Sequence, residues 1–129
     1  MKDGIDGDPS GNSLPPLVLI VEDEPATAGW LAAFMDAAGS RSLVVATLAA
    51  ARANWRTFNP DLILLDRSLP DGDGLDFAFE IRAVARCRIV IVTSQDSSTD
   101  RYAALAAGID DYLLKPIRHD DLWRLIRLA

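Results

Sequence analysis

Residues 62–66 read Leu-Ile-Leu-Leu-Asp, a continuous apolar run that stops at a carboxylate. Two other runs of this kind stop at polar side chains, one at Glu22-Asp23 and one at Thr93. Runs without alternation are typical of strands that are covered on both faces, as in a parallel sheet. Because such strands end at the same edge of the sheet, where open α/β folds bind their ligands, the sequence predicts a site there.

The same pattern predicts five strands, over residues 17–21, 42–46, 62–65, 88–92 and 109–114. Each strand is followed by a segment with helical periodicity. The residues predicted to face the core from these five helices are Leu31, Phe34, Met35 and Ala38; Leu48, Ala51 and Trp55; Phe77, Ala78, Ile81 and Val84; Leu105 and Ala106; and Leu122, Leu125 and Ile126. Strict alternation of strand and helix predicts an α/β fold, with one parallel sheet and helices on both faces.

Length and composition limit the class of protein. A chain of 129 residues fits one domain, and we expect residues 1–16, with little apolar content, to be a flexible extension before a domain at 17–129. The net charge of −6 disfavours nucleic-acid binding by this domain. The single Cys87 indicates a reducing compartment. The sequence has neither a signal peptide nor a membrane-spanning run, which predicts a cytoplasmic protein with no membrane association.

The predicted strand ends bring together side chains that are far apart in the sequence. Glu22, Asp23 and Asp66 are expected to meet at one edge, and like charges in a shared site would force one of them to protonate unless a cation is bound. Ligands that are all oxygen, with water and phosphate completing the shell, favour Mg²⁺ over Zn²⁺. Asp23 and Asp66 are the predicted direct ligands.

A carboxylate at such a site can also act as a nucleophile and form an aspartyl-phosphate, for which Asp66 is the candidate. The charge on a phosphoryl group must then be neutralised. We expect Mg²⁺ to hold one oxygen, the Lys115 ammonium a second, and the Thr93 hydroxyl with nearby backbone N–H groups a third. The turn-forming loop at residues 69–74, Leu-Pro-Asp-Gly-Asp-Gly, lets the backbone bend closely over this site.

The chain resembles the receiver domain of two-component response regulators. The resemblance covers about residues 17–129 and is carried by residues 19–24 (Leu-Ile-Val-Glu-Asp-Glu), 64–66 (Leu-Leu-Asp), 69–74, 92–94 (Val-Thr-Ser) and 112–116 (Tyr-Leu-Leu-Lys-Pro). It implies a flavodoxin-like, doubly wound sheet of five strands in the order 2-1-3-4-5 with five helices.

The resemblance also implies a role for each matched residue. Asp66 would be the phosphoacceptor, with Thr93 and Lys115 contacting the phosphoryl group. The metal site would comprise Glu22, Asp23, Asp66 and the backbone carbonyl of Ser68. Lys115-Pro116 would carry a cis peptide bond. Glu22 departs from the commoner Asp, and its longer side chain would be expected to reach the ion only through water.

The family implies partners and a switch as well. The phosphodonor would be a sensor histidine kinase or a histidine phosphotransfer protein, and the domain would catalyse its own phosphorylation and dephosphorylation. Thr93 and Tyr112 would pass the change to the face formed by the fourth helix, fifth strand and fifth helix, where a homodimer could form. The apolar end at Ala129 favours a longer protein with an output domain, which could itself bind DNA.

Two other functions remain open from the residues alone. An Asp-nucleophile phosphatase would also form an aspartyl-phosphate, but such enzymes need a second carboxylate two residues after the nucleophile, where this chain has Ser68. A receiver-like module that binds partners without phosphate would have no need of Asp66 or Lys115.

Overall fold

The computed structural model describes residues 14–127, so most of the expected N-terminal extension lies outside the described part. Five parallel strands form the central sheet: β2 (Leu17–Val21), β3 (Arg41–Val45), β4 (Leu62–Asp66), β7 (Arg88–Thr93) and β8 (Asp111–Leu114). Their spatial order is β3-β2-β4-β7-β8, which is 2-1-3-4-5 in chain order. The predicted flavodoxin-like topology is confirmed.

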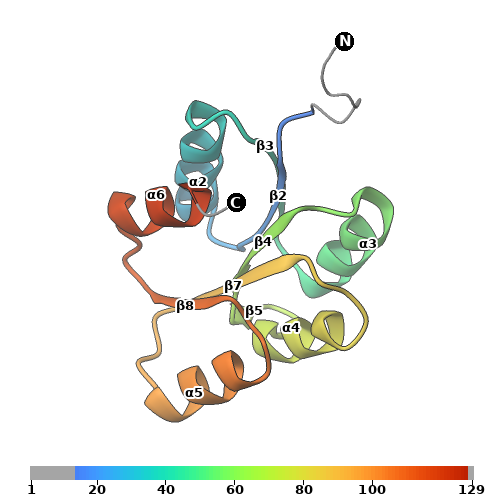
Figure 1. Ribbon diagram of the computed structural model, residues 1–129, viewed down its shortest axis with the longest axis vertical. Helices are drawn as coiled ribbons and strands as arrows, with labels where there is room; N and C mark the ends of the chain where they lie inside the picture. Colours follow the sequence, from blue (N-terminus) through green and yellow to red (C-terminus); the bar gives the residue numbers. More distant parts are fainter. Residues whose placement is uncertain (1–13, 128–129) are drawn as a thin grey trace.

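Five helices cover the two faces of the sheet (Figure 1). They are α2 (Pro25–Ala37), α3 (Leu48–Phe58), α4 (Gly74–Arg82), α5 (Ser98–Ala106) and α6 (His119–Arg127). Helices α2 and α6 lie on one face, and α3, α4 and α5 lie on the other. Within residues 14–127, no helix combines the length and apolar character needed to cross a membrane.

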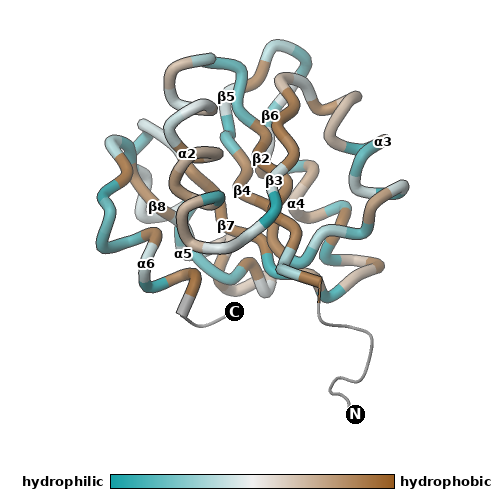
Figure 2. Tube along the Cα trace, turned by 90° about the horizontal axis from the view of Figure 1, so that it is seen from above, coloured by the Kyte–Doolittle hydropathy of each residue, from teal (hydrophilic) through white to brown (hydrophobic). Residues whose placement is uncertain are grey.

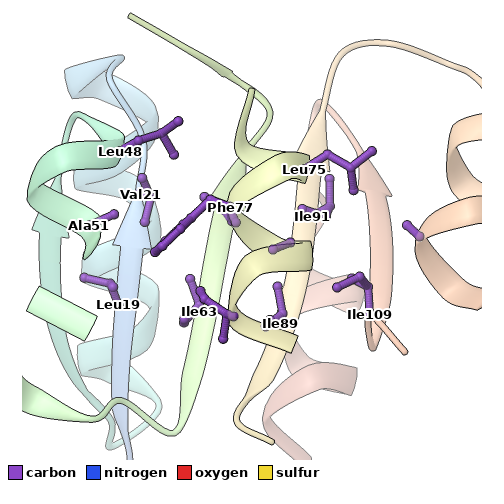
Figure 3. Packing of buried hydrophobic residues seen from close by; sticks show 14 of the residues in the cluster. Leu19, Val21, Leu48, Ala51, Ile63, Leu75, Phe77, Ile89, Ile91 and Ile109 are labelled. Atoms are coloured by element: carbon purple, nitrogen blue, oxygen red, sulfur yellow. The ribbon is translucent and has the colours of Figure 1, made fainter. Parts of the chain in front are cut away.

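Side-chain alternation along the strands divides the core into two clusters. Leu19, Ile63 and Ile89 face α3, α4 and α5, whereas the adjacent Val18 and Leu62 face α2 and α6. Figure 3 shows the first cluster, with Phe77 of α4 lying over the strands. The hydropathy colouring of Figure 2 shows the central strands as largely apolar and the helices as mixed. Because both faces are covered, the inner strands read as unbroken apolar runs.

Several local predictions were wrong, for identifiable reasons. Val84 and Leu105, predicted to face the core, are 75% and 44% exposed, and Ala106, also predicted to face the core, is exposed. Val84 follows the end of α4 at Arg82, and Ala104 takes the buried position on α5. Strand β3 begins one residue earlier than predicted and lies at the edge of the sheet, so that Val44 is exposed.

A short antiparallel pair was also not predicted. Strands β5 (Ser68–Leu69) and β6 (Gly72–Asp73) form a two-stranded ribbon between β4 and α4. The sequence indicated only a turn-rich loop here. The ribbon returns the chain to the end of β4, where the Gly74 N–H donates a hydrogen bond to the Arg67 carbonyl (2.8 Å).

Candidate functional site

The carboxyl ends of β2, β4, β7 and β8 carry the predicted site residues. Asp66 is the last residue of β4 and Thr93 the last of β7, while Glu22 and Lys115 follow β2 and β8 directly. Asp66, Glu22 and Thr93 are the polar residues buried in the described part of the chain. Buried polar groups are retained when they have partners or a function, so their position at one edge indicates a site.

Three carboxylates converge there, as predicted. Glu22, Asp23 and Asp66 each offer an oxygen, and these oxygens lie within 4.8 Å of one another. Glu22 and Asp66 are buried, whereas Asp23 is exposed. The group has only oxygen donors, which is the chemistry of a site for a hard divalent cation.

Lys115 supplies the positive charge in this cluster. Its Nζ donates hydrogen bonds to Glu22 Oε1 (2.8 Å) and to Asp66 Oδ2 (3.3 Å). Burial lowers the pKa of Lys115, but the hydrogen bond to Glu22 and the charges of Asp66 and Glu22 outweigh this effect, so its pKa lies above the usual value. The ammonium therefore stays charged at neutral pH.

Glu22 is held by both of its oxygens. Oε1 accepts from Lys115 and Oε2 accepts from the Glu24 N–H (3.2 Å). Burial raises the pKa of Glu22, and the neighbouring charge of Asp66 adds to this, against the effect of the Lys115 hydrogen bond. With both oxygens engaged, Glu22 is less free than Asp23 to bind an ion directly.

Backbone hydrogen bonds fix the other predicted residues. The Ser68 N–H donates to Asp66 Oδ1 (3.2 Å), and the Gln95 N–H donates to Thr93 Oγ1 (3.0 Å). The Lys115 N–H donates to the Thr93 carbonyl (2.8 Å), which ties the lysine to the end of β7. The Lys115-Pro116 peptide bond is cis.

Two aspartates of the 69–74 loop accept hydrogen bonds from N–H groups at the starts of helices. Asp71 accepts from the N–H groups of Leu48 (2.8 Å) and Ala49 (3.0 Å) at the start of α3, which lowers its pKa. Asp73 is the N-cap of α4 and accepts from the Leu75 N–H (2.9 Å). Each carboxylate satisfies otherwise unpaired helix N–H groups, so the loop connects α3, α4 and the site.

Tyr112 lies in β8, paired with Ile91 of β7, and only 1% of its surface is exposed. Its hydroxyl accepts a hydrogen bond from Arg67 Nη1 (3.2 Å). Arg67 also contacts Asp73 and Asp100, and sequence reasoning missed this group. The only signal was a charged residue next to Asp66, and its partners lie up to 45 residues away.

Comparison with known proteins identifies the class of domain that this fold and site define. A family model described as the response regulator receiver domain matches residues 18–127. The chain therefore belongs to the response regulator receiver domain family, which confirms the resemblance drawn from its motifs.

Particular relatives agree with this assignment. The chain is 38% identical over 112 residues to the KDP operon transcriptional regulatory protein KdpE of Escherichia coli K12, a match that covers 87% of this chain and 50% of the relative. It is 37% identical over 110 residues to the sensory transduction protein RegX3 of Mycobacterium tuberculosis H37Rv, covering 85% of this chain and 48% of the relative. The chain thus spans about half the length of these curated relatives.

A solved structure gives the same result. The BeF3-activated N-terminal receiver domain of Klebsiella pneumoniae RstA superposes with a TM-score of 0.81 at 30% identity, covering 87% of this chain and 96% of that chain. The similarity extends over nearly the whole of that receiver domain.

Proposed function

We propose that this chain is a phosphorylation-dependent signalling switch in which Asp66 accepts a phosphoryl group from a histidine kinase or a histidine phosphotransfer protein. The observation that carries the proposal is the position of the Lys115 ammonium, within 3.3 Å of Asp66 and 2.8 Å of Glu22 at a buried strand end. A carboxylate beside a fixed cation is suited to attack a phosphoryl group whose charge that cation can then balance.

The reaction is an in-line displacement at phosphorus. An oxygen of Asp66 forms the new P–O bond while the P–N bond of the donor phosphohistidine breaks, and the imidazole leaves with the electron pair. Lys115 would balance one phosphoryl oxygen, and Thr93 with the backbone N–H of Ser68 is suited to a further one. The buried position of Asp66 restricts water around the acyl phosphate.

The acidic group fits Mg²⁺. Asp23 and Asp66 would hold the ion directly, the backbone carbonyl of Ser68 would add an oxygen, and Glu22 would act through water because Lys115 and Glu24 occupy its oxygens. Bound there, Mg²⁺ would neutralise charge on the transferring group.

Partners and location follow from this role. Phosphorylation would act through Thr93 and Tyr112 on the face formed by α5, β8 and α6, where we propose that two copies associate. Because KdpE is a transcriptional regulatory protein about twice as long as its match, we infer that an attached output domain binds DNA, whereas this acidic domain does not. We place the protein in the cytoplasm, where its phosphodonor is available.

Incubation with Mg²⁺ and acetyl phosphate tests the proposal. We expect the intact mass to rise by one phosphoryl group, and we expect Asp66→Asn or removal of Mg²⁺ to abolish the change. Asp76→Asn, which alters an exposed carboxylate on α4, is the matched control and should still be labelled. Undiminished labelling of Asp66→Asn would refute the assignment.

Two alternatives have their own outcomes in this experiment. Rapid multiple turnover of phosphomonoesters would favour a phosphatase. Failure of the parent protein to respond to Mg²⁺ with acetyl phosphate or beryllofluoride would favour a module that binds partners without phosphate.

A further inference from the structure

Arg67, the residue directly after Asp66, is the centre of a partly buried hydrogen-bond network. Its Nε and Nη2 donate to the two oxygens of Asp73 (3.2 and 2.8 Å). Its Nη1 donates to Asp100 Oδ2 (2.7 Å) and to the Tyr112 hydroxyl (3.2 Å). The Arg67 side chain is only 11% exposed, whereas the side chains of Asp73 and Asp100 are 38% and 39% exposed, so the network lies at the protein surface with its arginine end turned inward. Such a planar, multiply bonded guanidinium has little freedom to move independently of its partners.

The partners belong to three different elements. Asp73 is the N-cap of α4, Asp100 lies in the first turn of α5, and Tyr112 lies in β8. The Arg67 backbone is also fixed, because its N–H donates to the Val92 carbonyl (3.1 Å). One residue thus joins the end of β4 to two helices and an edge strand.

The network determines the position of Tyr112. Arg67 holds its hydroxyl inside the protein, and the guanidinium carbon of Arg101 lies 5.4 Å from the centre of its ring. Moving the ring outward would break a charged hydrogen bond and separate the ring from a cation. Tyr112 is therefore held in its buried position by two arginines.

The aspartates of this network stay ionised at neutral pH. The hydrogen bond from Arg67 lowers the pKa of Asp73 and is also the main cause of the lowered pKa of Asp100. The ionised groups around Arg67 and the Tyr112 ring are two arginines, Arg67 and Arg101, and two aspartates, Asp73 and Asp100, so their charges cancel. The network is therefore a permanent link and not a group that titrates in the physiological range.

We propose that Arg67 is a positioning residue that couples the state of Asp66 to Tyr112 and to the start of α5. At the end of β4, Asp66 contacts Lys115, whereas the next residue, Arg67, contacts Tyr112, which belongs to the core cluster on the other face of the sheet. Arg67 transmits the change at Asp66 without itself touching the phosphoryl group. This inference rests on the proposed phosphorylation of Asp66 and identifies a residue of its signalling route.

Linkage makes the proposal measurable. If the buried position of Tyr112 is the one favoured by a phosphoryl group on Asp66, then a residue that stabilises that position must raise the affinity for a phosphoryl mimic. Loss of the Arg67 side chain should weaken Mg²⁺-beryllofluoride binding by about tenfold, the order expected for a charged hydrogen bond.

A double-mutant cycle on the whole chain provides the test. Beryllofluoride affinity, measured by calorimetry with Mg²⁺, is compared for the parent, Arg67→Met, Tyr112→Phe and the double variant. We expect the effect of Arg67→Met to be strongly reduced once Tyr112→Phe has removed the hydroxyl, so that the two effects are not additive. A merely structural role for Arg67 would lower stability without this dependence on Tyr112.

A spectroscopic measurement tests the position of the ring directly. The chain has two tyrosines, so Tyr102→Phe with fluorotyrosine labelling leaves one ¹⁹F signal, from Tyr112. We expect Arg67→Met to shift this signal even without ligand. Asp100→Asn should shift the ¹⁹F signal in the same direction but by a smaller amount. This variant replaces Arg67→Met in the experiment if Arg67→Met fails to fold.

Arg52→Met is the matched control. Arg52 forms a comparable two-bond pair with Glu80 (2.9 Å each) between α3 and α4, away from Tyr112. This variant should leave both the ¹⁹F signal and the affinity unchanged.

The two ways in which the test can fail are distinguishable. Additive effects together with an unmoved ¹⁹F signal, in a parent that binds beryllofluoride, would overturn the role of Arg67 alone. A parent that does not bind beryllofluoride with Mg²⁺ would overturn the proposed function and this inference with it.

Discussion

At the scale of single residues, Gly74 shows how closely the 69–74 loop approaches the site. A Cβ at this position would overlap the carbonyl oxygen of Asp66 and lie 3.0 Å from its carbonyl carbon. Backbone atoms cannot move aside as a flexible side chain can, so any substitution must displace the end of β4. The requirement for glycine comes from this close approach.

We predict that Gly74→Ala destabilises the protein by about 3 kcal/mol, at the upper end of the usual cost of overpacking. It should also slow phosphorylation by acetyl phosphate, because the Asp66 backbone must shift. Urea denaturation and the rate of mass change measure the two effects.

Gly29→Ala is the control for this substitution. Gly29 lies on the exposed face of α2 with nothing within 4 Å of an added Cβ. We expect this variant to be more stable than the parent by about 0.5–1 kcal/mol, because alanine is the better helix former. Equal effects of the two substitutions would contradict the argument from close approach.

The main site residues could be predicted from sequence because each follows a strongly patterned strand. The prediction that Asp66, Thr93 and Lys115 lie close together required only that each is at a strand end and that the strands are parallel. The network around Arg67 could not be predicted in this way. Asp100 lies 33 residues from Arg67, in the first turn of α5, and local patterns do not indicate which carboxylate an arginine meets.

At the scale of elements, the start of α4 combines a helix cap with an ion pair. The pKa of Asp73 is lowered first by the hydrogen bonds from Arg67 and further by the Leu75 N–H, against the effect of burial. A carboxylate whose pKa is lower in the folded chain stabilises the fold above its unfolded pKa. This stabilisation is lost as the pH falls through the folded value.

We therefore predict that the stability difference between the parent and Asp73→Asn is largest near neutral pH and decreases as the pH falls below about 4, the ordinary range of an aspartate. Asparagine is also a good N-cap, so this variant keeps the bond from the Leu75 N–H and isolates the charge. Urea denaturation at several pH values measures the difference.

The Arg67→Met background is the control. There the change in stability caused by Asp73→Asn should depend less on pH, since the main cause of the lowered pKa is absent. A change that keeps its full pH dependence without Arg67 would show that the ion pair is not responsible.

Element boundaries were less predictable than element types. Helix α4 ends before Val84, and the buried position on α5 belongs to Ala104 instead of Leu105. Short helices with many alanines give several similar apolar faces, and only packing against the sheet selects one. Val84 and Leu105, which were predicted to be buried, instead contribute apolar area to the protein surface.

At the scale of the whole molecule, the apolar side chains exposed on α5 lie on the face proposed to signal. Tyr102 and Leu105 are 76% and 44% exposed on the helix that Asp100 connects to Arg67. We predict that Mg²⁺ with beryllofluoride shifts the protein from monomer towards dimer in sedimentation experiments. The double variant Tyr102→Glu, Leu105→Glu should prevent dimer formation without preventing phosphorylation, because burying two carboxylates in the dimer interface is unfavourable.

Phe58→Glu is the corresponding control. Phe58, at the end of α3, is 51% exposed and lies away from the proposed interface. This variant should still dimerise. Dimer formation that survives the α5 substitutions but not Phe58→Glu would place the interface on the other side of the molecule.

Borohydride reduction followed by peptide mapping shows whether Asp66 is the residue that becomes phosphorylated. Borohydride reduces an acyl phosphate on aspartate to homoserine, which marks the modified position. After treatment with Mg²⁺ and acetyl phosphate, we expect homoserine at position 66, and none at Asp23 or Asp73. Homoserine at another aspartate, with position 66 unchanged, would contradict this expectation.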